Sequence, residues 1–131
     1  KGTALMEQVT ITRIEDITAY AGEHEIPGIR FKPARQALGV SSWGMNVLEL
    51  DAHCEGYPEH DHASDDHEEV YVVLRGEAVL QVGGVEHVLT EGAMVRVPGA
   101  LRRKIVTRAH GVTILALGGT PGKAYAASMG G

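Results

Sequence analysis

Three side chains that could bind a metal ion stand close together in the middle of the chain. His60 and His62 are separated by one residue, and Glu69 opens the apolar run that follows. Residues i and i+2 of an extended strand project from the same face, so both imidazoles can reach one ion. A carboxylate in an apolar strand is costly to bury without a partner, and a cation would supply one. Two imidazoles and one carboxylate suit a divalent ion such as iron, manganese, nickel, zinc or copper.

Two neighbours extend this candidate site. His67 lies two positions before Glu69 and could share its face, so it is an alternative third ligand to Glu69. If Glu69 faces inward, so does Tyr71, whose hydroxyl could donate a hydrogen bond to a ligand oxygen. The opposing interpretation is a solvated acidic loop without metal, and a Tyr71 that is only part of the core.

The charge of the chain is concentrated around these residues. The formal net charge is −5, yet the stretch from Glu55 to Glu69 alone carries seven acidic side chains and no Lys or Arg. The rest of the chain, with 12 basic and 10 acidic residues, has a net charge of +2. The acidity therefore lies where a cation would bind, and the average charge argues against an electrostatic nucleic-acid binder.

Composition limits the class of protein. A chain of 131 residues fits one domain, and 17 glycines favour many tight turns between short strands. The single cysteine excludes an internal disulfide framework. No apolar run reaches the ~18 residues that cross a bilayer, and the first residues lack the architecture of a signal peptide. We therefore expect a cytoplasmic domain that contacts neither membrane nor nucleic acid.

Short β-type runs must position the candidate ligands. Apolar and alternating patterns predict strands at 9–14, 45–50, 70–74, 78–82, 85–89, 93–97, 103–107 and 112–117. Gly83-Gly84 between two such runs predicts a type I′ hairpin, because both turn residues need a positive φ. Residues 22–39 contain several Gly and Pro and predict extended pieces and loops. Strands at this even spacing indicate a sandwich or barrel.

The order of these residues resembles the cupin superfamily over roughly residues 45–117. His60, His62, Glu69 and Gly76 follow one another as in the first cupin motif, and Gly92 with Pro98 begins the second. The resemblance implies an all-β double-stranded β-helix, or jelly-roll barrel, and a homodimer. We expect a barrel core at 41–118. Residues 1–40 would form a strand and loop segment on the barrel or across a dimer, and 119–131 a C-terminal arm.

The departures from the family pattern leave two functions open. Six residues separate His62 from Glu69, and the last histidine position of the second motif holds Arg103, or Arg102 if the turn is one residue earlier. Arginine cannot ligate a metal. In one interpretation Arg103 grips the carboxylate of a small anionic substrate beside the metal, as in an oxygenase, isomerase, decarboxylase or lyase. In the other, Arg103 pairs with Glu69 and the chain is a metal-free, non-catalytic binding or sensing module.

Overall fold

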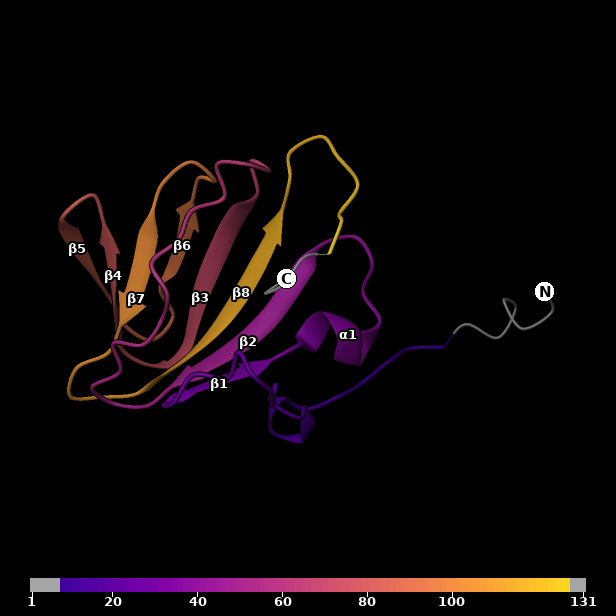
Figure 1. The fold of residues 1–131 in the computed structure, drawn as a ribbon. Helices are drawn as coiled ribbons and strands as arrows, with labels where there is room; N and C mark the ends of the chain where they lie inside the picture. The colour runs from indigo at the N-terminus through magenta and orange to yellow at the C-terminus, as the bar shows by residue number, and fades with distance from the viewer. Residues whose placement is uncertain (1–7, 128–131) are drawn as a thin grey trace.

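The computed structural model describes residues 8–127, in which β-strands dominate (Figure 1). The strands are β1 (Ile29–Lys32), β2 (Gly44–Leu50), β3 (Glu68–Gly76), β4 (Ala78–Val82), β5 (Val85–Leu89), β6 (Met94–Val97), β7 (Arg103–Val106) and β8 (Val112–Gly119). A 3-10 helix at Ile14–Asp16 and the short helix α1 (Ala34–Leu38) precede β2.

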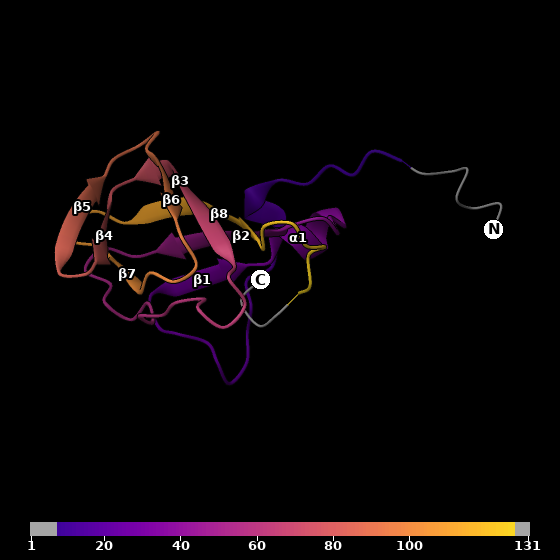
Figure 2. The same cartoon turned by 90° about the horizontal axis from the view of Figure 1, so that it is seen from above.

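The strands form two antiparallel sheets. One has five strands in the order β1-β2-β8-β3-β6, and the other has three in the order β5-β4-β7. Seen from above, β4, β5 and β7 stand together at one side of the molecule, and α1 lies at the opposite side, beside β2 (Figure 2). The all-β jelly-roll barrel predicted from the sequence is confirmed.

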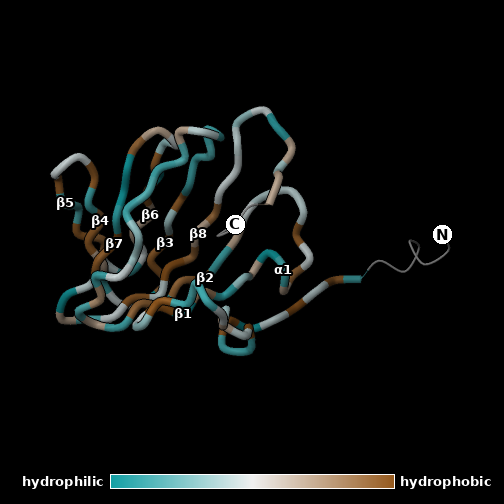
Figure 3. Tube along the Cα trace, viewed as in Figure 1, coloured by the Kyte–Doolittle hydropathy of each residue, from teal (hydrophilic) through white to brown (hydrophobic). Residues whose placement is uncertain are grey.

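Alternation along the strands decides which side chains enter the barrel. Tyr71 and Val73 on β3 are 1% exposed, and Arg103 and Ile105 on β7 are 0% exposed. These are the pairs that period-two alternation predicts to face the same way. The hydropathy of the chain changes along the same strands: β3 and β8 are hydrophobic at their lower end in Figure 3 and paler or hydrophilic at their upper end.

Turn glycines set the strand register. Gly83 and Gly84 have φ angles of 57° and 79°, which confirms the hairpin predicted between β4 and β5. Gly76 has a φ of 81°, and a Cβ at this position would collide with the carbonyl oxygen of Gly111. Only glycine fits that combination of left-handed backbone and close approach. The motif glycine at the end of β3 thus lets this strand approach the start of β8 closely.

Seven of the predicted strands overlap β2 to β8, but the strand predicted at 9–14 is wrong. Residues 8–13 are irregular and lead into the 3-10 helix, with Val9 86% and Ile11 85% exposed. In Figure 1 this segment runs away from the barrel. Alternation alone does not make a strand, because the backbone needs a partner to hydrogen-bond, and within the described chain this segment pairs with no other strand.

Residues 22–39 contain β1 and α1, of which the helix was not foreseen. Gly39 ends α1 in the left-handed conformation, with a φ of 77°. Ala34 packs with Ile17 and Val47 in a small cluster that also contacts Leu115. Because Val47 and Leu115 alternate with inward-facing residues, this cluster covers the outer face of β2 and β8.

The ends of the chain add little regular structure. The last strand, β8, ends at Gly119, the first residue of the C-terminal arm predicted at 119–131, and residues 128–131 of that arm lie outside the described part. Within residues 8–127, no helix is both long and apolar enough to cross a membrane.

Candidate metal site and its cavity

The His-x-His segment lies against the start of β7. His60 and Arg103 exchange backbone hydrogen bonds, with N···O distances of 3.0 and 2.8 Å. The N–H of His62 donates to the carbonyl oxygen of Gly99 at 2.7 Å. These contacts hold the segment extended, so the two imidazoles project to the same side with ring centroids 5.1 Å apart.

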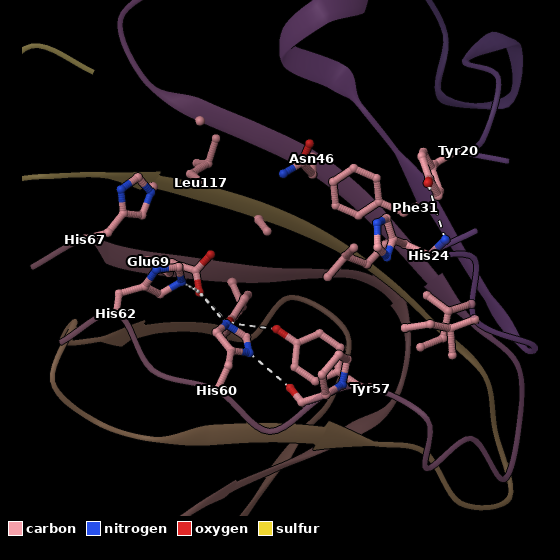
Figure 4. Close-up of a pocket in the computed structure, with 18 of the residues that line it drawn as sticks. Tyr20, His24, Phe31, Asn46, Tyr57, His60, His62, His67, Glu69 and Leu117 are labelled. Carbon is pink, nitrogen blue, oxygen red and sulfur yellow. Dashed lines mark hydrogen bonds and ion pairs between the residues drawn. The ribbon is translucent and has the colours of Figure 1, made fainter. Parts of the chain in front are cut away.

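Glu69, near the start of β3, faces both imidazoles. Its Oε1 lies 3.8 Å from Nε2 of His60 and 3.6 Å from Nε2 of His62. The three potential ligand atoms all lie within 4.8 Å of one another, close enough to hold one metal ion (Figure 4). Among the described residues, this is the group of histidine and acidic side chains with such geometry.

The imidazole nitrogens suit a metal. Nδ1 of His60 lies 3.0 Å from the carbonyl oxygen of Pro58. Because a carbonyl can only accept, Nδ1 carries the proton and the Nε2 lone pair faces the site. Nε2 of His62 is buried and has no hydrogen-bond partner within residues 8–127. A buried polar atom without a partner is uncommon, and a bound cation would satisfy it.

Arg103 lies inside the barrel, whereas the side chain of Arg102 is 60% exposed. The guanidinium of Arg103 donates a hydrogen bond from Nη1 to Oε1 of Glu69 at 2.7 Å. Nε and Nη2 donate to the carbonyl oxygens of Leu101 and Pro98 at 2.9 and 2.8 Å. The guanidinium is 0% exposed and forms an internal pair with Glu69. A role of Arg103 in binding a substrate carboxylate stays a prediction.

Two tyrosines complete the contacts of Glu69. The hydroxyl of Tyr71 donates to Glu69 Oε1 at 2.7 Å, and the hydroxyl of Tyr57 lies 3.2 Å from that of Tyr71. Since Tyr71 uses its proton on Glu69, Tyr57 donates to Tyr71. Burial raises the pKa of both phenols well above the usual value, so both stay protonated and keep these donor roles. Tyr57 was not foreseen, because it lies in a loop with no periodic pattern.

These partners keep Glu69 ionised. Burial alone raises the pKa of Glu69, but contacts with His60 and Tyr71 and the charges of His62 and Arg103 outweigh it and lower the pKa to about 2. The carboxylate beside it raises the pKa of His60, whereas burial lowers the pKa of His62. The site therefore combines one ionised carboxylate with two imidazoles whose pKa values are shifted in opposite directions.

His67 lies beside the three-residue group without joining it. It is 9% exposed and lines the cavity, with its ring centroid 5.1 Å from that of His62 and 5.8 Å from that of Tyr125. A Cβ on Gly118 would approach Nε2 of His67 to 2.6 Å, so the glycine makes room for the imidazole. Of the two alternatives for the third ligand, the geometry brings Glu69 to the histidine pair.

A cavity of about 680 Å³ opens from this group into the barrel. Figure 4 shows His60, His62, His67 and Glu69 on one side of it and Tyr20, His24 and Phe31 on the other. The N–H of Tyr20 donates to the carbonyl oxygen of Phe31 at 2.7 Å, which ties the segment before β1 to the edge of the sheet. The N-terminal half therefore supplies a wall of the cavity, a role that its sequence pattern did not predict.

Comparison with known proteins agrees with this fold and site. A sequence model of the family described as a cupin domain matches residues 47–115, more than half of the chain. The protein belongs to the cupin family. Among curated proteins, none matches the chain.

Solved structures of cupins superpose on most of the chain. A sugar phosphate isomerase from a cupin superfamily, from Silicibacter pomeroyi, has a TM-score of 0.70 and 22% identity, over 81% of this chain and 73% of that one. A predicted oxalate decarboxylase from Thermotoga maritima has a TM-score of 0.66 and 17% identity, over 82% and 96%. A cupin protein from Bacteroides fragilis has a TM-score of 0.63 and 16% identity, over 87% and 92%. At these identities the likeness concerns the fold.

Proposed function

We propose that the protein binds one divalent metal ion through His60, His62 and Glu69 and uses it to bind and act on a small organic molecule in the barrel. The observation that carries this is the buried Nε2 of His62, which has no hydrogen-bond partner among the described residues and lies 3.6 Å from Oε1 of Glu69. The tautomer fixed at His60 by Pro58 supports the same assignment. Iron, manganese, nickel, zinc and copper all accept this donor set.

The chain's own residues prepare the site. Arg103 and Tyr71 hold Glu69 ionised and in one orientation, and Tyr57 holds Tyr71. The bound ion would supply a Lewis acid that polarises a substrate oxygen. With three protein ligands, the ion would keep coordination positions open for that oxygen. His67 lies beside the group, where it can contact a bound molecule.

The substrate in this proposal is a small organic molecule, and an anionic group on it would bind to the metal ion. Arg103 is already paired with Glu69 and buried, so this proposal assigns that group to the metal instead. The structural neighbours of this chain include a sugar phosphate isomerase and a predicted oxalate decarboxylase. An oxygenase, isomerase, decarboxylase or lyase reaction fits a metal beside a cavity of this size.

A metal-free binding or sensing module is the second candidate. The observation that favours it is the 2.7 Å contact between Arg103 and Glu69, which already neutralises the carboxylate. In this alternative the same cavity binds a small molecule without chemistry.

Elemental analysis distinguishes the two. We expect close to one equivalent of metal in the purified protein, and its loss in His60→Ala and His62→Ala. His87→Ala, an exposed histidine on β5, is the matched control and should keep the metal. If both site variants keep the metal, His60 and His62 are not its ligands. A folded parent that takes up no divalent ion would favour the metal-free module.

We also propose that the segment at residues 8–13 pairs with a second copy of the chain to form a homodimer. Val9 and Ile11 alternate with polar residues and are 86% and 85% exposed, as in a strand that lacks its partner. Light scattering after size-exclusion chromatography should give a dimer for the parent and a monomer for a Val9→Asp/Ile11→Asp variant. Dimers in both would contradict this pairing. A cytoplasmic location stays a prediction.

A further inference from the structure

The cavity is large for a site that binds only a metal and a very small acid. Its volume of about 680 Å³ lies within the ~300–1,000 Å³ of pockets that hold drug-sized molecules. A water molecule occupies only ~30 Å³ in the liquid, so a substrate of a few atoms at the metal would leave most of this space unfilled. The structure thus has room for a substrate body beyond the metal.

Small residues of the five-stranded sheet line this space. Gly118 on β8 is paired with Gly44 on one side and with Glu69 on the other. A Cβ on Gly118 would approach His67 and one on Gly44 would approach Tyr125, so the two glycines make room for these rings. In the next inward-facing row, Ala116 lies between Asn46 and Tyr71 and lines the cavity with only a methyl group, where a larger side chain would enter it.

The wall away from the metal group is apolar and aromatic. It includes Tyr20, Ile26, Ile29, Phe31 and Leu48, with His24 beside them. Among the described residues that line the cavity there is no Lys or Arg, and Glu25 adds a negative charge. A phosphate or second carboxylate at that end would lose its hydration with no ammonium or guanidinium group to pair with and only the imidazole of His24 nearby, which is unfavourable.

We propose that the natural ligand has one oxygen-donor head group with at most one negative charge, joined to an aromatic or branched aliphatic body. The metal receives the head group, so this inference rests on the proposed function. The body lies against Phe31 and its apolar neighbours. The same wall disfavours a sugar phosphate, which has a polar body and a doubly charged end.

Calorimetric titration of the protein loaded with Mn²⁺ tests this with three probes. Pyruvate and phenylpyruvate share one 2-oxo acid head and differ by a phenyl ring, and ribose 5-phosphate carries a polar, doubly charged body. We expect phenylpyruvate to bind about tenfold to a hundredfold more tightly than pyruvate, because the ring leaves water for an apolar wall. Ribose 5-phosphate should bind more weakly than phenylpyruvate.

Ala116→Leu fills part of the cavity at a position that is not itself a proposed ligand of the metal. It should keep the metal but reduce the ratio of phenylpyruvate to pyruvate affinity to about one. Ala109→Leu, at an exposed position outside the cavity, is the matched control and should keep the parent ratio. If Ala116→Leu does not fold, Ile29→Asn on the edge strand β1 is used, and its ratio should fall by about tenfold.

Metal content separates the two levels of failure. If the parent holds Mn²⁺ but binds pyruvate as tightly as phenylpyruvate, or prefers ribose 5-phosphate, the apolar-body inference is overturned and the metal site stands. If the parent holds no Mn²⁺, the proposed function fails and the inference fails with it.

Discussion

The two ends of the barrel are made from the same strands but are filled in opposite ways. At the closed end, Val73, Ile105 and Ile114 are at most 1% exposed and pack into one apolar core. At the open end, the inward positions of β3 and β7 carry Glu69 and Arg103. The strands alternate in the same way throughout, so the direction of each side chain is common to both ends.

The difference lies in what each end requires of its neighbours. The apolar side chains of the closed end need only close packing. The open end buries a carboxylate and a guanidinium, which must each find specific partners. Glu69 finds Arg103, Tyr71 and the two imidazoles, and the guanidinium also donates to two backbone carbonyls. A functional site is thus obtained by changing side chains at one end of a barrel whose other end supplies much of the stability.

The largest expected effect comes from breaking the internal ion pair. Arg103→Met leaves Glu69 buried without its cation and should lower the free energy of unfolding of metal-free protein by about 3–5 kcal/mol. Urea denaturation measures this change. The double variant Arg103→Met/Glu69→Gln should recover much of the loss, because no charge is then left unpaired. A loss below about 1 kcal/mol in the single variant would contradict the importance of the pair.

At the closed end, Ile114→Ala tests packing alone. It removes a side chain that is 0% exposed and should lower the free energy of unfolding by about 2–5 kcal/mol. Metal content and ligand affinity should stay as in the parent, since Ile114 does not line the cavity. Loss of metal from folded Ile114→Ala would show that the two ends are not independent.

A smaller effect is expected from the tyrosines that support Glu69. Tyr71→Phe removes the donor to an ionised carboxylate and should cost about 1.5–3 kcal/mol. Tyr57→Phe removes a bond between neutral hydroxyls and should cost about 0.5–1.5 kcal/mol. Urea denaturation of the two metal-free variants gives the ranking. Equal losses, or a larger one for Tyr57→Phe, would mean that the contact with Glu69 is not the important one.

The sequence predicted the strands and the metal group better than it predicted their partners. Periodicity finds strands that pair within the chain, as at 78–82 and 85–89, but it also marked 9–14, where no partner strand is available within the described residues. Motif spacing found His60, His62 and Glu69 because neighbours in sequence share a face. The burial of Arg103 beneath Glu69 depends on the packing of distant strands, and no local pattern reports it.

The outer face of the five-stranded sheet carries a second carboxylate with cationic partners, which can be compared with Glu69. Glu49 on β2 contacts Arg30 at 3.0 Å and Lys32 at 3.4 Å, and the Arg30 side chain is 47% exposed. Burial raises the pKa of Glu49, but hydrogen bonds from Arg30 and Lys32 and their charges outweigh it, so the pKa lies below 4.5. The Glu49 side chain is 15% exposed, close to the 16% of Glu69, so the two pairs differ in their arginines, and solvent screens the exposed Arg30 more than the buried Arg103.

Glu49→Gln should therefore change the free energy of unfolding at pH 7 by less than about 1 kcal/mol. A lowered carboxyl pKa stabilises the folded state above the unfolded value and loses that contribution as pH falls through the folded value. The parent's small advantage over Glu49→Gln should thus be present above pH 4.5 and shrink below it. The urea midpoints of both proteins between about pH 6 and pH 3 measure this difference in stability. The titration of Glu69 affects both proteins equally and therefore cancels in the difference. If the two curves stay parallel, Glu49 adds no stability by ionising. A loss as large as that of Arg103→Met would mean that the exposure of the arginine does not distinguish the two ion pairs.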